Sequence, residues 1–407
     1  MTARLAIVCA AGVALLSAAG RGAEPFPRAT PESVGLNPAK FKEATDLLNR
    51  HVAEQKIAGA VAAVARHGKL VYLEAAGFQS IENRRPMTDR SLFRIYSMTK
   101  PVTAVAAMML HERGRFALTD PVAKYIPEFN SVVVGADGTT RPPLRPITVA
   151  DLLLHTSGLN HRTSEIYRRE KVRSRAQRLP EFIANIVRVP LMEDPGARYR
   201  YSEGTTVVGR LVEIWSGQPF DVFVTDRILK PLGMTDTSFW VAPDAQSRLT
   251  TVYSSQAATL SPIEIEEVPF TERPALLEGA VGLVSTVPDY VRFSQLLLNR
   301  GELHGVRLLT AKTVELMTAN GLSDRVQSAR GGPMGWGLAN VNVLIDPAAV
   351  NYPANRGEYG WDGSAGTIFW IDPLTEMVIV LMTQNQPANP DSLRQRFKTI
   401  VHQSISG

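Results

Sequence analysis

Strand-like segments lie near both ends of this chain, and the long stretch between them has a mostly helical pattern. Near the start, residues 58–65 and 70–76 are apolar runs separated by His67-Gly68-Lys69, which predicts a hairpin. Near the end, residues 335–344, 366–371 and 377–382 have the same character. Because strands need partners, a compact chain of this kind pairs its terminal strands in one sheet and carries the helices as an insert.

Composition places the chain among ordinary soluble globular proteins. Its 407 residues are 44% hydrophobic and 20% charged, which is enough for a substantial core. The net charge of +5 is small, the basic residues are scattered, and no nucleic-acid recognition motif occurs, so no nucleic-acid partner is expected. The seven histidines are dispersed and no H-E-x-x-H motif is found. We therefore predict no metal and no cofactor.

The first 20 residues are typical of a secretory signal peptide. Arg4 precedes an apolar run at residues 5–16, and Ser17-Ala18-Ala19-Gly20 offers small residues for cleavage. The run is short for a membrane span, although an uncleaved anchor is the alternative. Cys9, the sole cysteine, lies in this segment, so the mature chain would have no disulfide. We expect an exported protein, periplasmic or secreted, with no membrane span after cleavage.

A serine and a lysine one helical turn apart form the strongest chemical signal. In Ser97-Met98-Thr99-Lys100 the two side chains share a helix face, at the start of the apolar run 102–110. Burial would lower the pKa of Lys100, so that its amine could take the proton of Ser97. The helix N-terminus would favour an oxyanion nearby. The alternative for such a pair is a capping serine beside a solvated lysine.

A nucleophilic serine also needs a second proton-handling group, and Tyr201 is the candidate. It lies in a predicted loop just before a helix that begins near Gly204. Taken alone, such a tyrosine could equally be a packed aromatic residue. His155 is a weaker candidate, because the chain has no G-x-S-x-G elbow and the histidine is expected to hold loop structure.

Five segments together resemble the serine β-lactamase and penicillin-binding-protein superfamily, and more narrowly its class C-like branch with the family-eight carboxylesterases. They follow the family's order and span roughly residues 28–405. The segments are 93–100 (FRIYSMTK), 152–159 (LLLHTSGL), 199–202 (YRYS), 334–337 (MGWG) and 360–367 (GWDGSAGT).

The resemblance implies a fold and a set of roles. The fold is of the α/β class, α+β type: an antiparallel sheet flanked by helices plus an all-helical subdomain. After the leader, residues 21–407 would form one hydrolase domain, with a sheet part at about 28–110 and 275–407 and a helical part at about 111–274. Ser97 would be acylated, with Lys100 as its base and Tyr201 passing protons to the leaving group. The backbone N–H groups of Ser97 and Ser364 would form the oxyanion hole, with Ser364 on an edge strand.

Two departures from the family pattern favour an esterase. The β-lactamase motif Tyr-x-Asn is absent, and Glu203 stands at its third position; this residue could face the cleft or cap the following helix. The motif Lys-Thr-Gly is also absent, and Trp361-Asp362-Gly363 replaces it. Trp361 cannot bind a carboxylate as a lysine does, but it offers an apolar wall. Trp361 and Gly363 are therefore expected to contact a small neutral ester.

The sequence thus predicts an exported serine hydrolase, in the first place a carboxylesterase on small neutral esters that works through an acyl-enzyme. One alternative is a β-lactamase or D-amino-acid-specific peptidase, with Arg356 or another loop arginine binding the substrate carboxylate. A further alternative is a non-catalytic relative that binds cell-wall fragments. The basic stretch at residues 165–178 is either a solvated helix face or a mobile loop, or a lid that attracts anionic substrate.

Overall fold

The computed structural model describes residues 26–136, 139–256 and 259–406 of the chain. The predicted leader at residues 1–20 and Cys9 lie outside the described residues. Within the described part, no helix is both long and apolar enough to cross a membrane.

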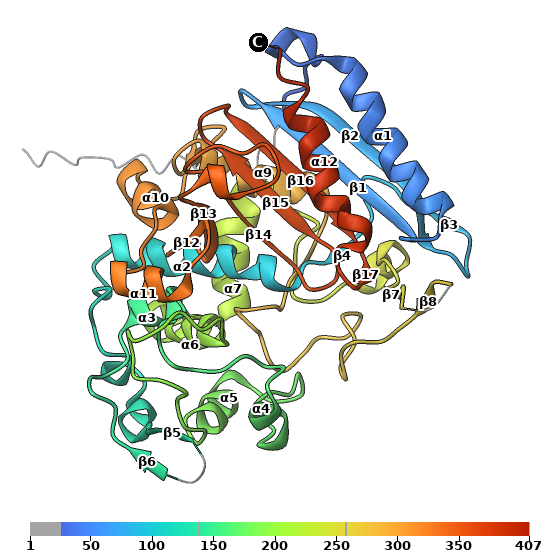
Figure 1. Cartoon of the computed structure of the whole chain (residues 1–407). Coiled ribbons are helices and arrows are strands. Elements are labelled where there is room, and N and C mark those ends of the chain that lie inside the picture. Colours follow the sequence, from blue (N-terminus) through green and yellow to red (C-terminus); the bar gives the residue numbers. More distant parts are fainter. Residues whose placement is uncertain (1–25, 137–138, 257–258, 407) are drawn as a thin grey trace, which may run out of the picture.

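One antiparallel sheet joins strands from both ends of the chain, as the sequence predicts (Figure 1). β1 and β16 lie side by side in its interior, with Ala60 opposite Thr383 and Val64 opposite Ile379. In the described residues the strand order is β12 (Met334–Gly337), β13 (Val341–Leu344), β14 (Tyr359–Asp362), β15 (Ile368–Asp372), β16 (Met377–Thr383), β1 (Gly59–Arg66), β2 (Lys69–Ser80) and β3 (Arg85–Pro86).

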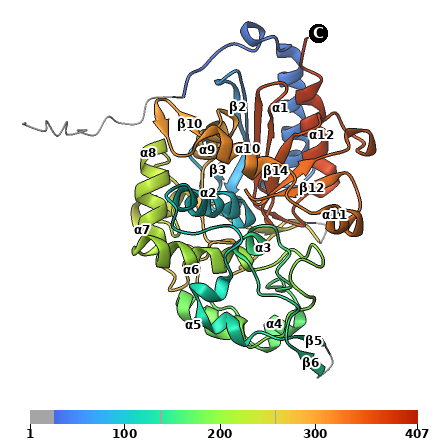
Figure 2. The same ribbon diagram turned by 90° about the vertical axis from the view of Figure 1, so that its left-hand side faces the viewer.

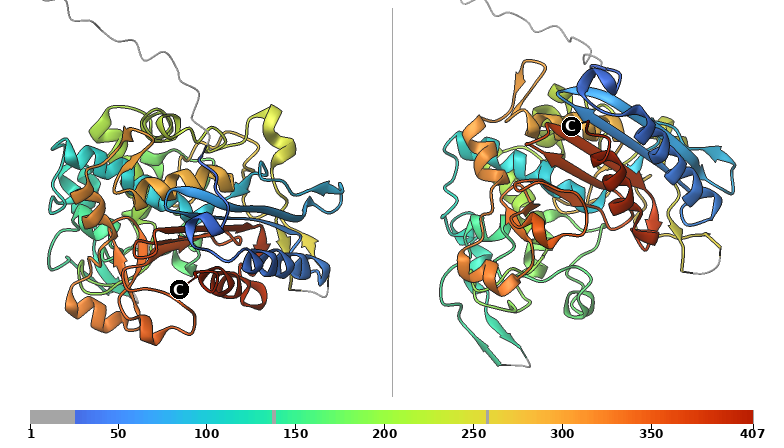
Figure 3. Two further views of the ribbon diagram at one scale, coloured as in Figure 1. Left: turned by 90° about the horizontal axis from the view of Figure 1, so that it is seen from above. Right: turned by 45° about the horizontal axis from the view of Figure 1, so that its top comes forward.

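Helices cover both faces of this sheet, which is why β1 and β16 are almost continuously apolar. One face packs against α1 (Pro38–Ala53) and α12 (Leu393–His402), which lie side by side in Figure 1. The other face packs against α9 (Val287–Leu298), as the view from above in Figure 3 shows. Along β1, Ala62 and Val64 belong to the first core, whereas Val61 and Ala63 belong to the second.

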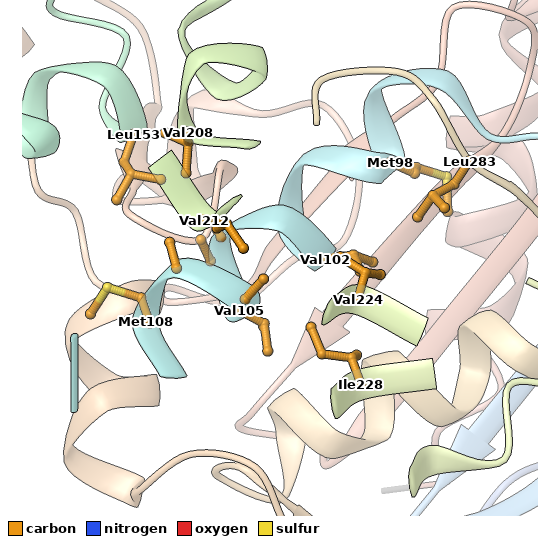
Figure 4. Close-up of a cluster of buried hydrophobic side chains, with 14 of the residues drawn as sticks. Met98, Val102, Val105, Met108, Leu153, Val208, Val212, Val224, Ile228 and Leu283 are labelled. Carbon is orange, nitrogen blue, oxygen red and sulfur yellow. The ribbon is translucent and has the colours of Figure 1, made fainter. Parts of the chain in front are cut away.

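The helix that follows the serine is central to the second core. α2 (Thr99–Glu112) is buried on nearly all sides, as expected for its apolar sequence. It packs chiefly against α6 (Gly204–Ser216). Figure 4 shows Val102, Val105 and Met108 of α2 among side chains from neighbouring helices, including Val208 and Val212. Because this packing surrounds α2, the start of the helix is held rigidly.

The helical part lies at one end of the sheet, with α4, α5 and the hairpin β5–β6 at its far end in Figure 2. Its helices are α3 (Val149–Leu153), α4 (Glu165–Arg169), α5 (Leu179–Ile186), α6, α7 (Phe220–Val224) and α8 (Lys230–Leu232). It also contains short strands that the sequence pattern missed: β5 (Val134–Ala136), β6 (Thr139–Arg141), β7 (Tyr253–Ser254) and β8 (Ser261–Pro262).

Smaller elements complete the described chain. Two helices, α10 (Ala311–Thr318) and α11 (Asp324–Arg330), precede β12. The remaining short strands are β4 (Phe93–Arg94), which pairs with β9 (Val284–Ser285), the pair β10 (Glu302–Leu303) and β11 (Val306–Arg307), and β17 (Asn385–Gln386) beside β7.

The predicted single strand at 335–344 is wrong. The segment forms two strands, β12 and β13, joined by a tight turn in which Asn340 has a left-handed φ of 58°. Asparagine tolerates this conformation better than other residues with a side chain. A single asparagine can therefore form a turn inside an otherwise apolar segment.

Candidate active site

Ser97 lies at the junction between the sheet part and α2. After β4, the chain forms a single 3₁₀ turn at Tyr96–Met98, and α2 begins at Thr99. Ser97 thus lies at the start of a helix, as predicted, in a 3₁₀ turn that leads directly into α2, and its side chain faces that of Lys100 at i+3. Tyr96, directly before the serine, has a positive φ of 41°. Such a backbone persists only where its surroundings enforce it, and it is often found at functional sites.

Lys100 points at the serine from a fully buried position. Its Nζ lies 3.3 Å from Ser97 Oγ and donates to the carbonyl oxygen of Ala280 at 3.1 Å. Burial, which penalises the ammonium form, lowers the pKa of Lys100 from 10.5 to about 7. A large fraction of Lys100 is thus neutral near pH 7, and a neutral amine at this distance can accept the hydroxyl proton.

Tyr201 lies in the loop before α6, and its side chain is next to those of Ser97 and Lys100. Its ring lies 4.6 Å from Lys100 Nζ, and its hydroxyl accepts a hydrogen bond of 3.1 Å from Trp361 Nε1. Burial raises the pKa of Tyr201 well above its usual value, and side-chain hydrogen bonds with Ser97 and Trp361 oppose the shift only in part. Tyr201 is therefore a neutral phenol that can relay a proton, and Lys100 is the base.

His155 is not a base in this arrangement. It is fully buried, and burial lowers its pKa well below the usual value, so the ring is neutral. Its Nδ1 lies 3.2 Å from Ser202 Oγ, and its ring packs 4.6 Å from the ring of Tyr201. His155 thus fixes the loop that carries Tyr201, as the sequence suggested.

The turn between β14 and β15 brings Ser364 toward the serine. A Cβ on Gly363 would lie 2.4 Å from the carbonyl oxygen of Ile95, so only glycine allows this close approach to the segment before Ser97. Ser364 itself is exposed and lies in the turn after β14. The edge-strand expectation is wrong, because β14 has β13 on one side and β15 on the other.

Two backbone amides are available at this junction. Within the described residues, neither the N–H of Ser97 nor that of Ser364 donates a hydrogen bond to a protein acceptor. Two such unsatisfied donors on adjoining turns are what an oxyanion hole requires. That these two amides form the oxyanion hole stays a prediction.

An aromatic cluster forms one wall beside Tyr201. Trp361 on β14 is partly exposed, and it packs edge-to-face on Trp336 with ring centroids 4.6 Å apart. Trp336 on β12 is fully buried, and its Nε1 donates to the carbonyl oxygen of Leu153 at 3.1 Å. Trp336 lies in the family-like segment 334–337, but the sequence alone predicted no role for it. The signal was present, because a tryptophan between two glycines on a strand has room to pack a neighbouring ring.

The two acids near the serine have different surroundings. Asp362 is 40% exposed and is paired with Arg394 of α12, which also donates to the carbonyl oxygens of Gly363 (3.1 Å) and Thr367 (3.2 Å). Asp362 therefore helps to clamp the β14–β15 turn. Glu203 is fully buried directly before α6 but makes no capping hydrogen bond to the helix, so the capping expectation is wrong.

The basic stretch 165–178 contains both exposed and buried arginines. Arg168 and Arg169 of α4 are exposed. Arg173 instead turns inward and makes a two-pronged ion pair with the fully buried Glu278, and Arg175 is fully buried as well. The inner half of the stretch is therefore anchored in the protein and is not a charged lid.

A cavity of about 470 Å³ adjoins Tyr201. Its lining includes His161, Arg198, Tyr199 and Arg330, whereas Arg356, the arginine named from the sequence, does not line it. Arg200 also lines it but is paired with Glu193, so the lining arginines that could meet an anionic substrate are Arg198 and Arg330, the last residue of α11.

One group of described residues has a metal-like arrangement, away from the serine. Ligand atoms of Glu358, Asp372 and His402 lie within 4.8 Å of one another, at the end of β14 opposite to Ser364. The ammonium of Lys398 already pairs with Glu358, and Asp372 accepts hydrogen bonds from Asn355 and Thr375. The carboxylates of Glu358 and Asp372 are therefore already stabilised by donors of the protein, as a bound cation would stabilise them.

The fold and this site define a serine hydrolase of the β-lactamase and transpeptidase type. A family model described as Beta-lactamase matches residues 44–402, and the chain belongs to this family. It is 30% identical to Esterase EstB of Burkholderia gladioli over 380 residues, which are 87% of this chain and 93% of that protein.

Two solved structures have the same fold. EstCE1, described as a hydrolase with promiscuous acyltransferase activity, matches with a TM-score of 0.80 and 26% identity, covering 91% of this chain and 99% of that one. A class C β-lactamase matches with a TM-score of 0.71 and 18% identity, covering 91% and 97%. The predicted fold and family are confirmed, and the non-catalytic alternative finds no support in these hydrolase relatives.

Proposed function

We propose that this protein is a carboxylesterase that hydrolyses small neutral esters through an acyl-enzyme on Ser97. The observation that carries the proposal is the 3.3 Å contact between a fully buried Lys100 and Ser97. The tryptophan at the position of the β-lactamase lysine favours an ester over a β-lactam.

Acylation begins when Ser97 Oγ attacks the ester carbonyl and Lys100 takes the hydroxyl proton. The negative charge on the carbonyl oxygen is stabilised by the amides of Ser97 and Ser364, each worth about 10²–10³-fold in rate. The bond to the alcohol then breaks, and the proton returns to the alcohol from Lys100 through the hydroxyl of Tyr201. Water attacks the acyl group in the second half, Lys100 and Tyr201 transfer the proton again, and the free acid leaves.

The substrate class follows from the wall beside Tyr201. Trp361, supported by the buried Trp336, presents an apolar ring, and the adjacent acid, Asp362, is paired with Arg394. Such a surface binds neutral apolar groups. The similarity to Esterase EstB and to EstCE1, a hydrolase with acyltransferase activity, supports an ester substrate.

The test compares p-nitrophenyl butyrate with a chromogenic cephalosporin, using the wild-type enzyme and Ser97→Ala. We expect ester hydrolysis, little cephalosporin turnover, and loss of activity in Ser97→Ala. Labelling of wild-type Ser97 by a fluorophosphonate probe should accompany activity. Efficient cephalosporin hydrolysis without esterase activity would overturn the substrate assignment.

A second candidate function is favoured by one observation. Arg198 and Arg330 line the cavity beside Tyr201 and could bind the carboxylate of a β-lactam or of a D-amino-acid peptide. If this is the substrate, Arg198→Ala should raise KM for the cephalosporin and leave p-nitrophenyl butyrate hydrolysis unchanged. Equal KM values for the cephalosporin would exclude this use of the cavity.

The proposed place of action is outside the cytoplasm, on the basis of the leader pattern in residues 1–20. Fractionation of cells that express the full chain, followed by N-terminal sequencing, tests it. An uncleaved chain in the cytoplasm would contradict export.

A further inference from the structure

Glu203 is a buried acid that the proposed mechanism does not yet use. Its side chain is fully buried, two residues after Tyr201. Thr206 Oγ1 donates to its Oε2 at 3.3 Å, while its Oε1 accepts no hydrogen bond from the described residues. Burying a carboxylate with an unused oxygen is costly, and capping does not explain it here.

The start of α6 adjoins the surroundings of Lys100. Lys100 Nζ donates to the carbonyl of Ala280, and Thr103 Oγ1, one turn further along α2, donates to that of Gly279 at 2.7 Å. A Cβ on Gly279 would lie 2.5 Å from the carbonyl oxygen of Thr205. Tyr201, two residues before Glu203, therefore contacts Lys100, and Thr205, two residues after it, packs against Gly279, the neighbour of the Ala280 that accepts from Lys100.

Several arginines and glutamates are paired behind the site. Arg173 pairs with Glu266 at 2.8 Å and with Glu278 at 2.6 Å. Two further guanidinium groups share these same two acids: Arg162 lies 3.6 Å from Glu266, and Arg175 lies 3.8 Å from Glu278. In the described residues these guanidinium groups pair with Glu266 and Glu278, and Glu203 takes part in none of these ion pairs.

We propose that the carboxylate of Glu203 is the electrostatic partner of Lys100, stabilising the ammonium that forms when Lys100 takes the proton of Ser97. Glu203 is a positioning residue in this scheme: it forms no bond to the substrate and exchanges no proton. Its charge acts where positive charge develops, which lowers the barrier to acylation. The inference rests on the proposed function, because it requires Lys100 to act as the base.

The charged groups around Lys100 determine how its pKa should change when Glu203 is removed. After burial, which lowers the pKa of Lys100, the largest opposing influence is the charge of Glu203. Arg162 lowers this pKa further, whereas Glu278 and Asp362 raise it. The neutral rings of His155 and His161 lie on the same side of the site, against Tyr201. Loss of the Glu203 charge alone must therefore make Lys100 a weaker base.

The experiment measures the second-order rate of fluorophosphonate labelling at Ser97 against pH, so that no natural substrate is needed. In Glu203→Gln, which keeps the shape, the acid limb should move to lower pH by about one unit, because a weaker base loses its proton earlier. The rate at high pH should fall by roughly 10–100-fold, because the ammonium is no longer stabilised. Hydrolysis of p-nitrophenyl butyrate should show the same two changes.

Two further variants make the result specific. Glu203→Asp keeps the charge and should retain the wild-type acid limb, even if the rate falls. Glu128→Gln neutralises an exposed acid and should match the wild type in both measurements. Each protein is checked for folding by circular dichroism, and if Glu203→Gln does not fold, the Asp variant and Glu203→Asn carry the comparison.

The failures of the two proposals can be told apart. If wild-type Ser97 does not label at any pH, the serine hydrolase mechanism itself fails. If the wild type labels and Glu203→Gln has an unchanged pH profile, Glu203 is only structural and this inference is wrong.

Discussion

At the scale of single residues, the chemistry depends on the cost of placing a charge on Lys100. The side chain is fully buried between Ser97 and the carbonyl of Ala280, where water cannot solvate an ammonium. That cost makes the amine a base near neutral pH. It also makes Lys100 unfavourable for folding, because the unfolded chain keeps the lysine charged and hydrated.

The first prediction concerns activity against pH. Because Lys100 must be neutral to accept a proton and its pKa is about 7, kcat/KM should rise with pH through about 7 and then level off. Lys100→Met should lower kcat/KM by roughly 10²–10⁴-fold at pH 8. A wild-type profile that is flat from pH 5 to 9 would contradict this role.

The second prediction concerns stability at the same residue. The folded pKa of about 7 lies below the usual 10.5, so the unfolded state binds more protons between these values and the stability of the wild type rises with pH there. Lys100→Met removes the penalty and should raise Tm. The gain should be largest below pH 7 and shrink toward pH 10. Equal Tm values for the two proteins at pH 6 would show that Lys100 imposes no penalty.

At the scale of elements, the serine is positioned by turns and not by the helix alone. The 3₁₀ turn presents Ser97, and the β14–β15 turn presents Ser364. The second turn is held from behind the sheet by α12, through the bonds of Arg394 to Asp362 and to two carbonyl oxygens. A helix on the far face of the sheet therefore controls one side of the site.

The third prediction tests that clamp. Arg394→Met should lower kcat by roughly 10-fold or more with little change in KM, because a turn that shifts by 1 Å misplaces an oxyanion donor. Ester hydrolysis kinetics measure the effect. Arg396→Gln is the matched control, since Arg396 lies on the same helix but pairs with the partly exposed Asp391. Unchanged kinetics in Arg394→Met would show that the turn needs no clamp.

At the scale of the whole molecule, the site lies where three separate parts of the chain meet. α2 follows the first strands, the 199–203 loop belongs to the helical part, and β14 comes from the end of the chain. A buried ion network ties the helical part to the returning segment through Arg173 and Glu278. Burial opposes the charged form of Glu278, but the charge and hydrogen bonds of Arg173, together with the charges of Arg162 and Arg175, keep the pKa of Glu278 below its usual value.

The fourth prediction concerns this connection. Glu278→Leu leaves the guanidinium groups of Arg173 and Arg175 buried without a full partner and should lower the free energy of unfolding by about 3–5 kcal/mol. Asp46→Ala removes an exposed pair with Lys42 and should cost less than about 1 kcal/mol. Urea denaturation of the two variants checks the difference. Similar values for both would mean that the network does not hold the parts together.

Local features of the sequence predicted much of the architecture. Alternation and apolar runs located β1, β2 and β16, and the spacing of Ser97 and Lys100 on one helical turn located the reacting pair, because both signals depend only on residues close in sequence. Thr148 and Asp151, three residues apart, form a full capping box at the start of α3, which is a signal of the same local kind. The break at Asn340 was missed because neighbouring apolar residues gave no signal for it.

The sequence by itself determined the pairing of the terminal strands in one sheet, the helical insert and the serine–lysine pair, since periodicity and short spacing fix these locally. Only the tertiary structure decided that Ser364 lies in a turn beside the segment before Ser97, that Trp336 supports Trp361, and that Glu203 is fully buried. These relationships join positions far apart in the chain, and they depend on close packing, such as that of Gly363 against Ile95, which no local pattern encodes.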